Sequence, residues 1–376
     1  MSRMKFGAFL APHHPIGENP TLQFRSDIAL AKRLDELGFD EFWCGEHHST
    51  GWEVIASPEM FLAAVGEHTH TIKLGTGVVS LPYHHPFNVA QRMVQLDHMT
   101  RGRAIFGSGP GALPSDAYVL GIDPMVQRDR QDEAIGVIKR LMAGERVTHE
   151  TDWFTLRDAR LQLFPLQEDM PFVVASQVSP SGMTLPGKYG AGVISIGSMS
   201  SAGLLSLPTQ WSFAEEAAAK HGRTVDRKDW RVLMTWHIAE TRAEARAQAG
   251  EGLMRWHNEY NVGTLMRPGA VAYGSADEAV DMTAFSPGAV GVIGTPDDLV
   301  ARHVIPEVNG LLEGYRTSRQ YVIDHRESFE RAGQAVMKKI MDHEGAAAAF
   351  RETQLAATAA PGGHTPDLEK EKAKAR

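Results

Sequence analysis

The most informative segment of the sequence is Cys44-Gly45-Glu46-His47-His48-Ser49-Thr50-Gly51-Trp52-Glu53, which follows the strand-like run FDEFW at 39–43. An α/β barrel carries its chemistry where a strand ends in a polar, glycine-containing loop. Histidine titrates near neutral pH, so His47 and His48 are candidates for proton transfer. Adjacent side chains on an extended segment point to opposite faces, so we expect at most one of the two to enter a site there. The alternative interpretation is that both are histidines of a surface loop.

Strand-like runs recur on both sides of this stretch, and each is followed by a helical pattern. The first four strand–helix pairs start roughly 30 to 36 residues apart, which favours a parallel sheet with right-handed crossovers, as in a (β/α)8 barrel. No convincing eighth strand follows, because 289–293 is the only late candidate and is short. The predicted strands are 5–11, 41–45, 73–81, 103–107, 172–176, 192–196 and 230–238, and the predicted helices include 22–37, 57–69, 86–99, 129–142, 211–221 and 242–260.

The domain prediction is one barrel over 1–343 with two excursions and a tail. The excursion near 144–165 reads as a small hairpin around Trp153, and the one near 263–290 is rich in Gly, Ala and Pro and reads as a mobile loop or lid. Residues 344–376 change from Ala-rich to Pro/Gly-rich to Glu/Lys-rich, and we expect that tail to be disordered.

Composition excludes several classes of function. The chain has 376 residues and a net charge of -8, which does not suggest a nucleic-acid partner. Cys44 is the only cysteine, so no intrachain disulfide can form. No secretory signal core and no apolar span of the ~20 residues needed to cross a membrane is present. The expectation is a cytoplasmic protein without a membrane partner.

Three histidine pairs fall at or just beyond predicted strand ends, where a barrel would bring them to one face. A catalytic metal would need His and carboxylate ligands with one position left open. No Asp follows a late strand and no His-x-His motif marks the first strand, so we expect no metal. The pairs are His13-His14, His47-His48 and His84-His85, and the metal alternative would use His13, Glu46, His47 and His84.

Two further loops are suited to a flat or phosphorylated ligand. Gly107-Ser108-Gly109-Pro110-Gly111 would let the backbone approach such a ligand closely, although a tight turn explains it equally well. The loop 176–182 offers hydroxyls and free amides to a phosphate, particularly if a helix begins next. Pro186 and Gly187 weaken that helix. Lys188 either contributes a positive charge to phosphate binding or is a solvated surface residue.

Taken together, these segments resemble the bacterial luciferase-like flavin-dependent monooxygenase family, and within it the limonene 1,2-monooxygenase-like branch. The similarity is near continuous from residue 5 to about 298, and its motifs are long and occur in order. It implies a (β/α)8 barrel, a homodimer, and reduced FMN (or FAD) as co-substrate, supplied with NAD(P)H electrons by a separate flavin reductase. The matching segments are 6–9 (FGAF), 46–53 (EHHSTGWE), 75–86 (GTGVVSLPYHHP), 95–103 (QLDHMTRGR) and 111–118 (GALPSDAY).

The resemblance also implies roles for individual residues. His47 would lie beside the flavin and act as acid, base or hydrogen-bond partner to a flavin hydroperoxide, whose oxygen passes to an alkene or carbonyl of a small apolar, terpene-like substrate. The barrel would exclude water so that peroxide is not lost. The implied cofactor-binding residues are Ser108, Ser176, Ser179, Ser181 and Gly182, and the predicted substrate pocket consists of Phe9, Trp52, Met60 and His84.

Two departures from the family pattern stand out. Pro110 occupies a position where many members carry an arginine for the phosphate. The segment 294–299 runs almost directly into 302–306, which resembles the end of the family's final helix, so the eighth strand looks deleted. We expect another segment or a partner subunit to fill the gap, because open strand edges invite pairing.

Two alternative functions remain open: a deazaflavin-dependent oxidoreductase of the same fold, and a flavin-binding member with impaired catalysis.

Overall fold

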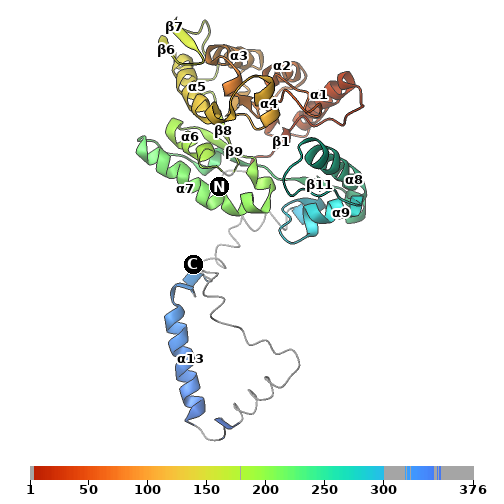
Figure 1. The fold of residues 1–376 in the computed structure, drawn as a ribbon, viewed down its shortest axis with the longest axis vertical. Coiled ribbons are helices and arrows are strands. Elements are labelled where there is room, and N and C mark those ends of the chain that lie inside the picture. Colours follow the sequence, from red (N-terminus) through yellow and green to blue (C-terminus); the bar gives the residue numbers. More distant parts are fainter. Residues whose placement is uncertain are drawn as a thin grey trace. The chain divides into compact units, whose positions relative to one another are not determined.

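The structure is a computed structural model that describes residues 4–177, 179–299, 318, 320–321, 323–342, 345 and 347–348. The chain divides into two compact units, Met1–Leu299 and Val300–Arg376 (Figure 1). In the second unit the long described element is α13 (Arg326–Met341). The expected disorder of 344–376 falls almost entirely outside the described residues, and a single domain reaching residue 343 stays a prediction.

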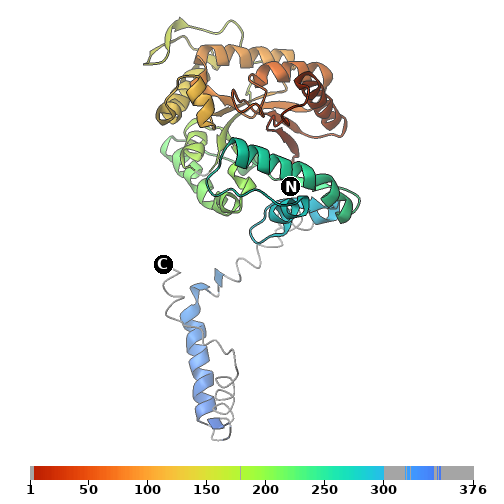
Figure 2. The same cartoon turned by 45° about the vertical axis from the view of Figure 1, so that its right-hand side comes forward.

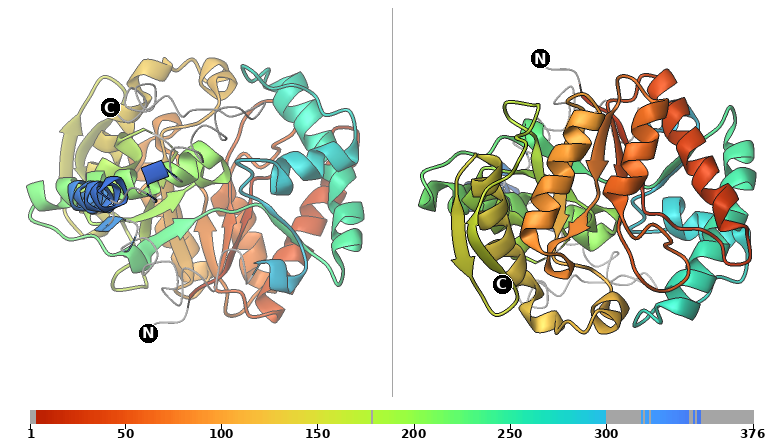
Figure 3. Two further views of the ribbon diagram at one scale, coloured as in Figure 1. Left: turned by 90° about the horizontal axis from the view of Figure 1, so that it is seen from below. Right: turned by 90° about the horizontal axis from the view of Figure 1, so that it is seen from above.

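A curled, parallel sheet forms the centre of the first unit. The order of its strands is β1 (Gly7–Leu10), β2 (Glu41–Cys44), β3 (Lys73–Thr76), β5 (Ala104–Gly109), β8 (Phe172–Ser176), β9 (Gly192–Ser195) and β10 (Trp230–Val232), and β4 (Val79–Ser80) also pairs with β5. Each crossover carries helices that cover the outer face of the sheet (Figure 2, Figure 3). The parallel alternation predicted from the sequence is confirmed.

The barrel is incomplete. β11 (Trp236–Ile238) and β12 (Val292–Gly294) form a separate parallel pair, so the predicted strand 230–238 is divided in two. The late candidate 289–293 overlaps β12, which has only three residues. Within residues 4–177 and 179–299 no ladder joins β12 to β1, in agreement with the absence of a regular eighth strand. What fills that gap stays a prediction.

The helices follow the predicted pattern with shifted ends. They are α1 (Pro20–Glu36), α2 (Pro58–His68), α3 (Pro86–Met99), α4 (Pro114–Val119), α5 (Gln127–Met142), α6 (Ser181–Tyr189), α7 (Ser201–Lys220), α8 (Arg242–Arg255), α9 (Ala276–Val280) and α10 (Pro296–Leu299). Proline occupies the first turn of α1, α2, α3 and α4, where its missing N–H costs no hydrogen bond.

One local prediction is confirmed and two need correction. The hairpin around Trp153 is confirmed as β6 (Val147–Glu150) and β7 (Thr155–Ala159). The excursion 263–290 is not a continuous loop, because Ser275 within it caps the helix α9 and a π-helical segment, η6 (Asp281–Phe285), follows. Helix 242–260 changes after Arg255 into a second π-helical segment, η5 (Trp256–Thr264).

Alternating side chains of each strand enter two different apolar layers. Phe42 points outward into the large cluster between sheet and helices, whereas Trp43 points inward. Inside the curled sheet, Trp43 packs with residues of four other strands: Phe9, Ile105, Val173 and Ile194. This inner layer is therefore an apolar cluster built from five strands of the sheet.

Gly107 on β5 shows how closely neighbouring strands approach. A Cβ at this position would lie 1.9 Å from the backbone oxygen of Thr76, so alanine forces the two strands apart. We expect Gly107→Ala to cost about 1–3 kcal/mol of unfolding free energy, measured by urea denaturation. Gly252→Ala on α8 is the matched control, because a Cβ there meets nothing within 4 Å. Equal stability of the two variants would contradict the expectation.

Candidate active site

The loop between β2 and α2 is held in place by backbone contacts at the carboxyl-terminal edge of the sheet. The amide of His47 donates to Ile55 O at 3.1 Å, and the amide of His14 donates to Trp52 O at 2.7 Å. Thr50 and Gly51 both have positive φ, so the chain turns back sharply between these contacts. The turn folds the loop so that its polar side chains face the strand ends.

His47 lies between two carboxylates. Its Nδ1 is 2.9 Å from Asp116 Oδ2, and its Nε2 is 3.1 Å from Glu53 Oε1. The same Asp116 accepts hydrogen bonds from the amide of His48 and the hydroxyl of Ser49. Asp116 is buried on α4, where these bonds lower its pKa although burial alone would raise it. The ring of His47 is thereby held at both nitrogens.

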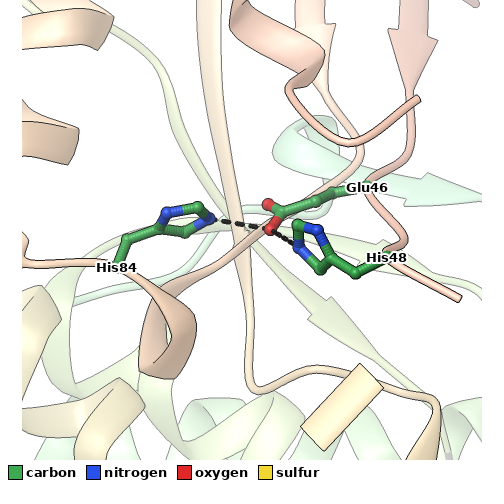
Figure 4. A group of neighbouring side chains, drawn as sticks. All are labelled: Glu46, His48 and His84. Atoms are coloured by element: carbon green, nitrogen blue, oxygen red, sulfur yellow. Dashed lines mark hydrogen bonds and ion pairs between the residues drawn. The ribbon is translucent and has the colours of Figure 1, made fainter. Parts of the chain in front are cut away.

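Glu46 is a second, separate centre of hydrogen bonds (Figure 4). Its Oε1 is 2.7 Å from the Nε2 atoms of both His48 and His84, and its Oε2 accepts from the amide of Ser80 at 2.9 Å. The carboxylate is fully buried. Arg92 extends this network of hydrogen bonds, because its Nη2 lies 3.4 Å from His84 Nδ1.

The hydrogen bonds to Glu46 decide its charge. Burial raises the pKa of a carboxyl group, but the bonds from His48 and His84 outweigh burial and lower the pKa of Glu46 to about 2. The same bond to Glu46 raises the pKa of His48, against the opposing effect of burial. Glu46 is therefore an ionised, fully paired carboxylate at neutral pH.

Glu46, His48 and His84 are also the group of described residues whose ligating atoms lie close enough, within 4.8 Å of one another, to hold a metal ion. A metal ion would need the Nε2 lone pairs, whereas the observed bonds to Glu46 need N–H groups there. The donor from Arg92 at His84 Nδ1 also places the proton of a neutral His84 on Nε2. The three side chains are joined by hydrogen bonds, and the expectation of no catalytic metal stays a prediction.

Each histidine pair contributes at least one side chain to these two groups of hydrogen bonds, but His14 and His85 bond elsewhere. His13 reaches Glu53 at 3.2 Å and joins His47 there, while His84 joins His48 at Glu46. The side chains of His47 and His48 are 18% and 17% exposed, so the surface-loop interpretation is wrong for both. The other members of two pairs are structural: His14 binds Asp27 of α1, and His85 caps α3.

The predicted phosphate loop lies at the start of a helix. α6 begins at Ser181 despite the weakening residues Pro186 and Gly187, and the hydroxyls of Ser179 and Ser181 are 3.0 Å apart. A Cβ at Gly182 would lie 2.8 Å from Ser176 Cα, so only glycine fits this close approach. Ser176 itself is buried and donates to Gln210. Lys188 is paired with Asp132, at a distance from the helix start.

Ser108 differs from its predicted setting in a loop. β5 continues to Gly109, so Ser108 lies within a strand and is completely buried. Its hydroxyl has no hydrogen-bond partner, which is uncommon for a buried polar group. A ligand atom reaching this strand end would satisfy it.

The predicted substrate-pocket residues do not share one environment. Phe9 packs with the inner apolar layer, Trp52 is buried, and His84 is bound to Glu46. Met60 is 74% exposed on α2, so its position gives no support to a place in an enclosed pocket. Its neighbours Phe61 and Leu62 are the ones that face the core, because the helix turns by about 100° per residue.

Three residues of the site were not singled out from the sequence. Asp116 lies inside the matching segment GALPSDAY, which was a usable signal. Glu53 is the last residue of the matching segment EHHSTGWE, and the family resemblance implies no role for it. Tyr260, whose hydroxyl donates to Glu53 Oε2, is 207 positions away in the chain and carries no motif. Only folding brings it to the site.

Known proteins with similar sequences are monooxygenases by name. The sequence model of the family described as Luciferase-like monooxygenase matches residues 4–305. Limonene 1,2-monooxygenase of Rhodococcus erythropolis is 48% identical over 300 residues, which is 80% of this chain and 76% of that protein. The 4-hydroxyprotoasukamycin monooxygenase of Streptomyces nodosus subsp. asukaensis is 45% identical over 361 residues, covering 86% of this chain and 97% of the relative.

A solved structure is similar over most of the chain. The oxygenating constituent of 3,6-diketocamphane monooxygenase from Pseudomonas putida, a type II Baeyer-Villiger monooxygenase in complex with FMN, superposes with a TM-score of 0.67 at 26% identity. The match covers 82% of this chain and 88% of that one.

Among the described residues, every helix is too short or too polar to span a membrane.

Proposed function

Because the chain belongs to the luciferase-like monooxygenase family, we propose that it is a flavin-dependent monooxygenase that uses reduced flavin and O2 to oxygenate a small apolar, terpene-like substrate at an alkene or carbonyl carbon. The observation that carries the proposal is His47, held by Glu53 and Asp116 at the carboxyl-terminal edge of the sheet. This is the edge at which barrel enzymes place their reacting groups.

The residues present fit a flavin. The loop at Ser179, Ser181 and Gly182 offers two hydroxyls and the free amides of a helix start to a phosphate, and Pro110 adds no charge there. The unpartnered hydroxyl of Ser108 lies near the end of β5, and the hydroxyl of Ser176, which donates to Gln210, lies at the end of the adjacent strand β8. Bound reduced flavin, FMN or FAD, would supply the electrons that activate O2.

The chain's own groups would supply proton control and a dry site. His47 would hold or deliver a proton at Nε2, the nitrogen that now faces Glu53. Phe9, Trp52 and the inner apolar layer would keep water away from the reacting atoms. We include in the proposal a separate reductase using NAD(P)H, a homodimer and a cytoplasmic location.

Stopped-flow absorbance tests the proposal. Purified protein is mixed with reduced FMN and then with oxygenated buffer, and the flavin spectrum is followed. We expect a long-lived oxygenated species that free flavin does not form, and O2 consumption coupled to oxygenation of limonene or a cyclic ketone. Oxidation indistinguishable from free flavin would contradict the proposal. Substrate-dependent reduction of a deazaflavin without O2 uptake would select the deazaflavin alternative instead.

The phosphate loop gives a separate prediction. Ser181→Ala removes one hydroxyl from the start of α6, so we expect FMN affinity to fall by about tenfold, the value of one hydrogen bond to a charged group. Riboflavin, which has no phosphate, provides the internal control and should bind both proteins equally. Fluorescence titration measures both. Parallel losses for FMN and riboflavin would place the phosphate elsewhere.

A further inference from the structure

Glu53 is a buried carboxylate that joins three segments distant in the sequence. Its Oε1 is 3.1 Å from His47 Nε2 and 3.2 Å from His13 Nε2, and its Oε2 accepts a hydrogen bond from the Tyr260 hydroxyl. The side chain is only 4% exposed. His13 lies in the loop after β1, Glu53 in the loop after β2, and Tyr260 in η5, beyond α8.

Tyr260 is held firmly in this position. Its ring lies edge-to-face against His13 with 4.5 Å between centroids, and 5.8 Å from the ring of Trp52. Burial, and next the charge of Glu53, raise its pKa far above the usual value of a phenol, against a smaller effect of Arg267. The hydroxyl therefore remains a donor, and its acceptor is Glu53 Oε2.

Because the Tyr260 hydroxyl donates to Oε2 of Glu53, the other oxygen, Oε1, is left to bond to the imidazoles of His47 and His13. If the Tyr260 hydroxyl were removed, Oε2 would become a buried acceptor without a partner, which is unfavourable because its desolvation is no longer compensated. Rotation of the carboxylate would relieve that cost and would withdraw Oε1 from His47. The other charged group facing His47 is Asp116 at Nδ1, which α4 holds independently of Tyr260.

We propose that Tyr260 is a positioning residue that acts on His47 through Glu53, so that the packing of η5 against the barrel controls the hydrogen bond at Nε2. The segment is π-helical, a conformation often found at functional sites. The role in catalysis rests on the proposed function of His47. The contact itself is independent of any ligand, and this independence provides the first test.

The first test measures the imidazole directly. Nitrogen NMR of 15N-histidine-labelled full-length protein gives the ring resonances, and His47→Ala identifies those of His47. We expect Tyr260→Phe, which keeps the packed ring, to shift the His47 Nε2 resonance. Tyr189→Phe is the matched control, because Tyr189 also donates to a carboxylate, that of Asp132. An unchanged His47 resonance in Tyr260→Phe would overturn the proposal.

The second test is a double-mutant cycle in the oxygenation assay. We expect Tyr260→Phe to lower kcat about tenfold, with KM changed less than about twofold, as for loss of one charge-assisted hydrogen bond. In the Glu53→Gln and His47→Ala backgrounds the same substitution should lower kcat less than about twofold, because the hydrogen bond between Glu53 and His47 through which Tyr260 acts is already lost or altered. Full additivity would overturn the proposal. An NMR shift in a protein that does not oxygenate would refute the proposed function and leave the positioning contact supported.

Discussion

His47→Ala is expected to lower the oxygenation rate by about 10²-fold or more, the typical contribution of a positioned acid or base. The reason is geometric: Glu53 and Asp116 hold both ring nitrogens, so the imidazole is oriented before any substrate arrives. No other described side chain contacts both carboxylates in this way. The measurement is product formation with saturating reduced FMN and O2.

The control for this prediction is a histidine of the same chain outside the site. His70→Ala changes an exposed residue in the turn before β3 and should retain the parent rate. Flavin affinity should change little in His47→Ala, which separates a chemical role from a binding role. An unchanged oxygenation rate in His47→Ala would reject the catalytic assignment.

Glu46→Ala is expected to cost about 3–5 kcal/mol of unfolding free energy, because it removes the buried anion that pairs with His48 and His84. The amide of Ser80 also loses its acceptor. Urea unfolding at neutral pH measures the cost. Glu251→Ala on the exposed face of α8 is the control and should fall within about 0.5 kcal/mol of the parent. A similar small change in Glu46→Ala would contradict the prediction.

The stability supplied by Glu46 should depend on pH. Its pKa is lowered from 4.5 to about 2 on folding, so the contribution is present above pH 4.5 and is lost as the pH falls toward 2. Unfolding free energies of the parent and of Glu46→Gln should therefore converge over this range. Constant separation between the two curves down to pH 2 would contradict the assignment. His48 follows the opposite sign, since its raised pKa gives stability that is lost as the pH rises.

Most strands and helices can be predicted from the sequence, because the residues that indicate them are contiguous. Strands 41–45 and 172–176 are short apolar runs between turn residues, and the structure places them at Glu41–Cys44 and Phe172–Ser176. The sequence pattern predicts one strand over 230–238, whereas the structure has two strands that pair with different neighbours, β9 and β12. Local periodicity does not record such a change of partner, because the backbone pattern is strand-like on both sides.

Contiguous residues are enough to predict the parallel strand–helix alternation, the family and a functional role for His47, because motifs and turn residues are local features of the sequence. The carboxylate that each histidine contacts follows only from the folded arrangement. Adjacent His47 and His48 diverge to Glu53 and Glu46, and Tyr260 arrives from 207 positions away. Such contacts depend on the curvature of the sheet and on the packing of η5. Both result from the burial of residues that are far apart in the sequence, so no local pattern predicts them.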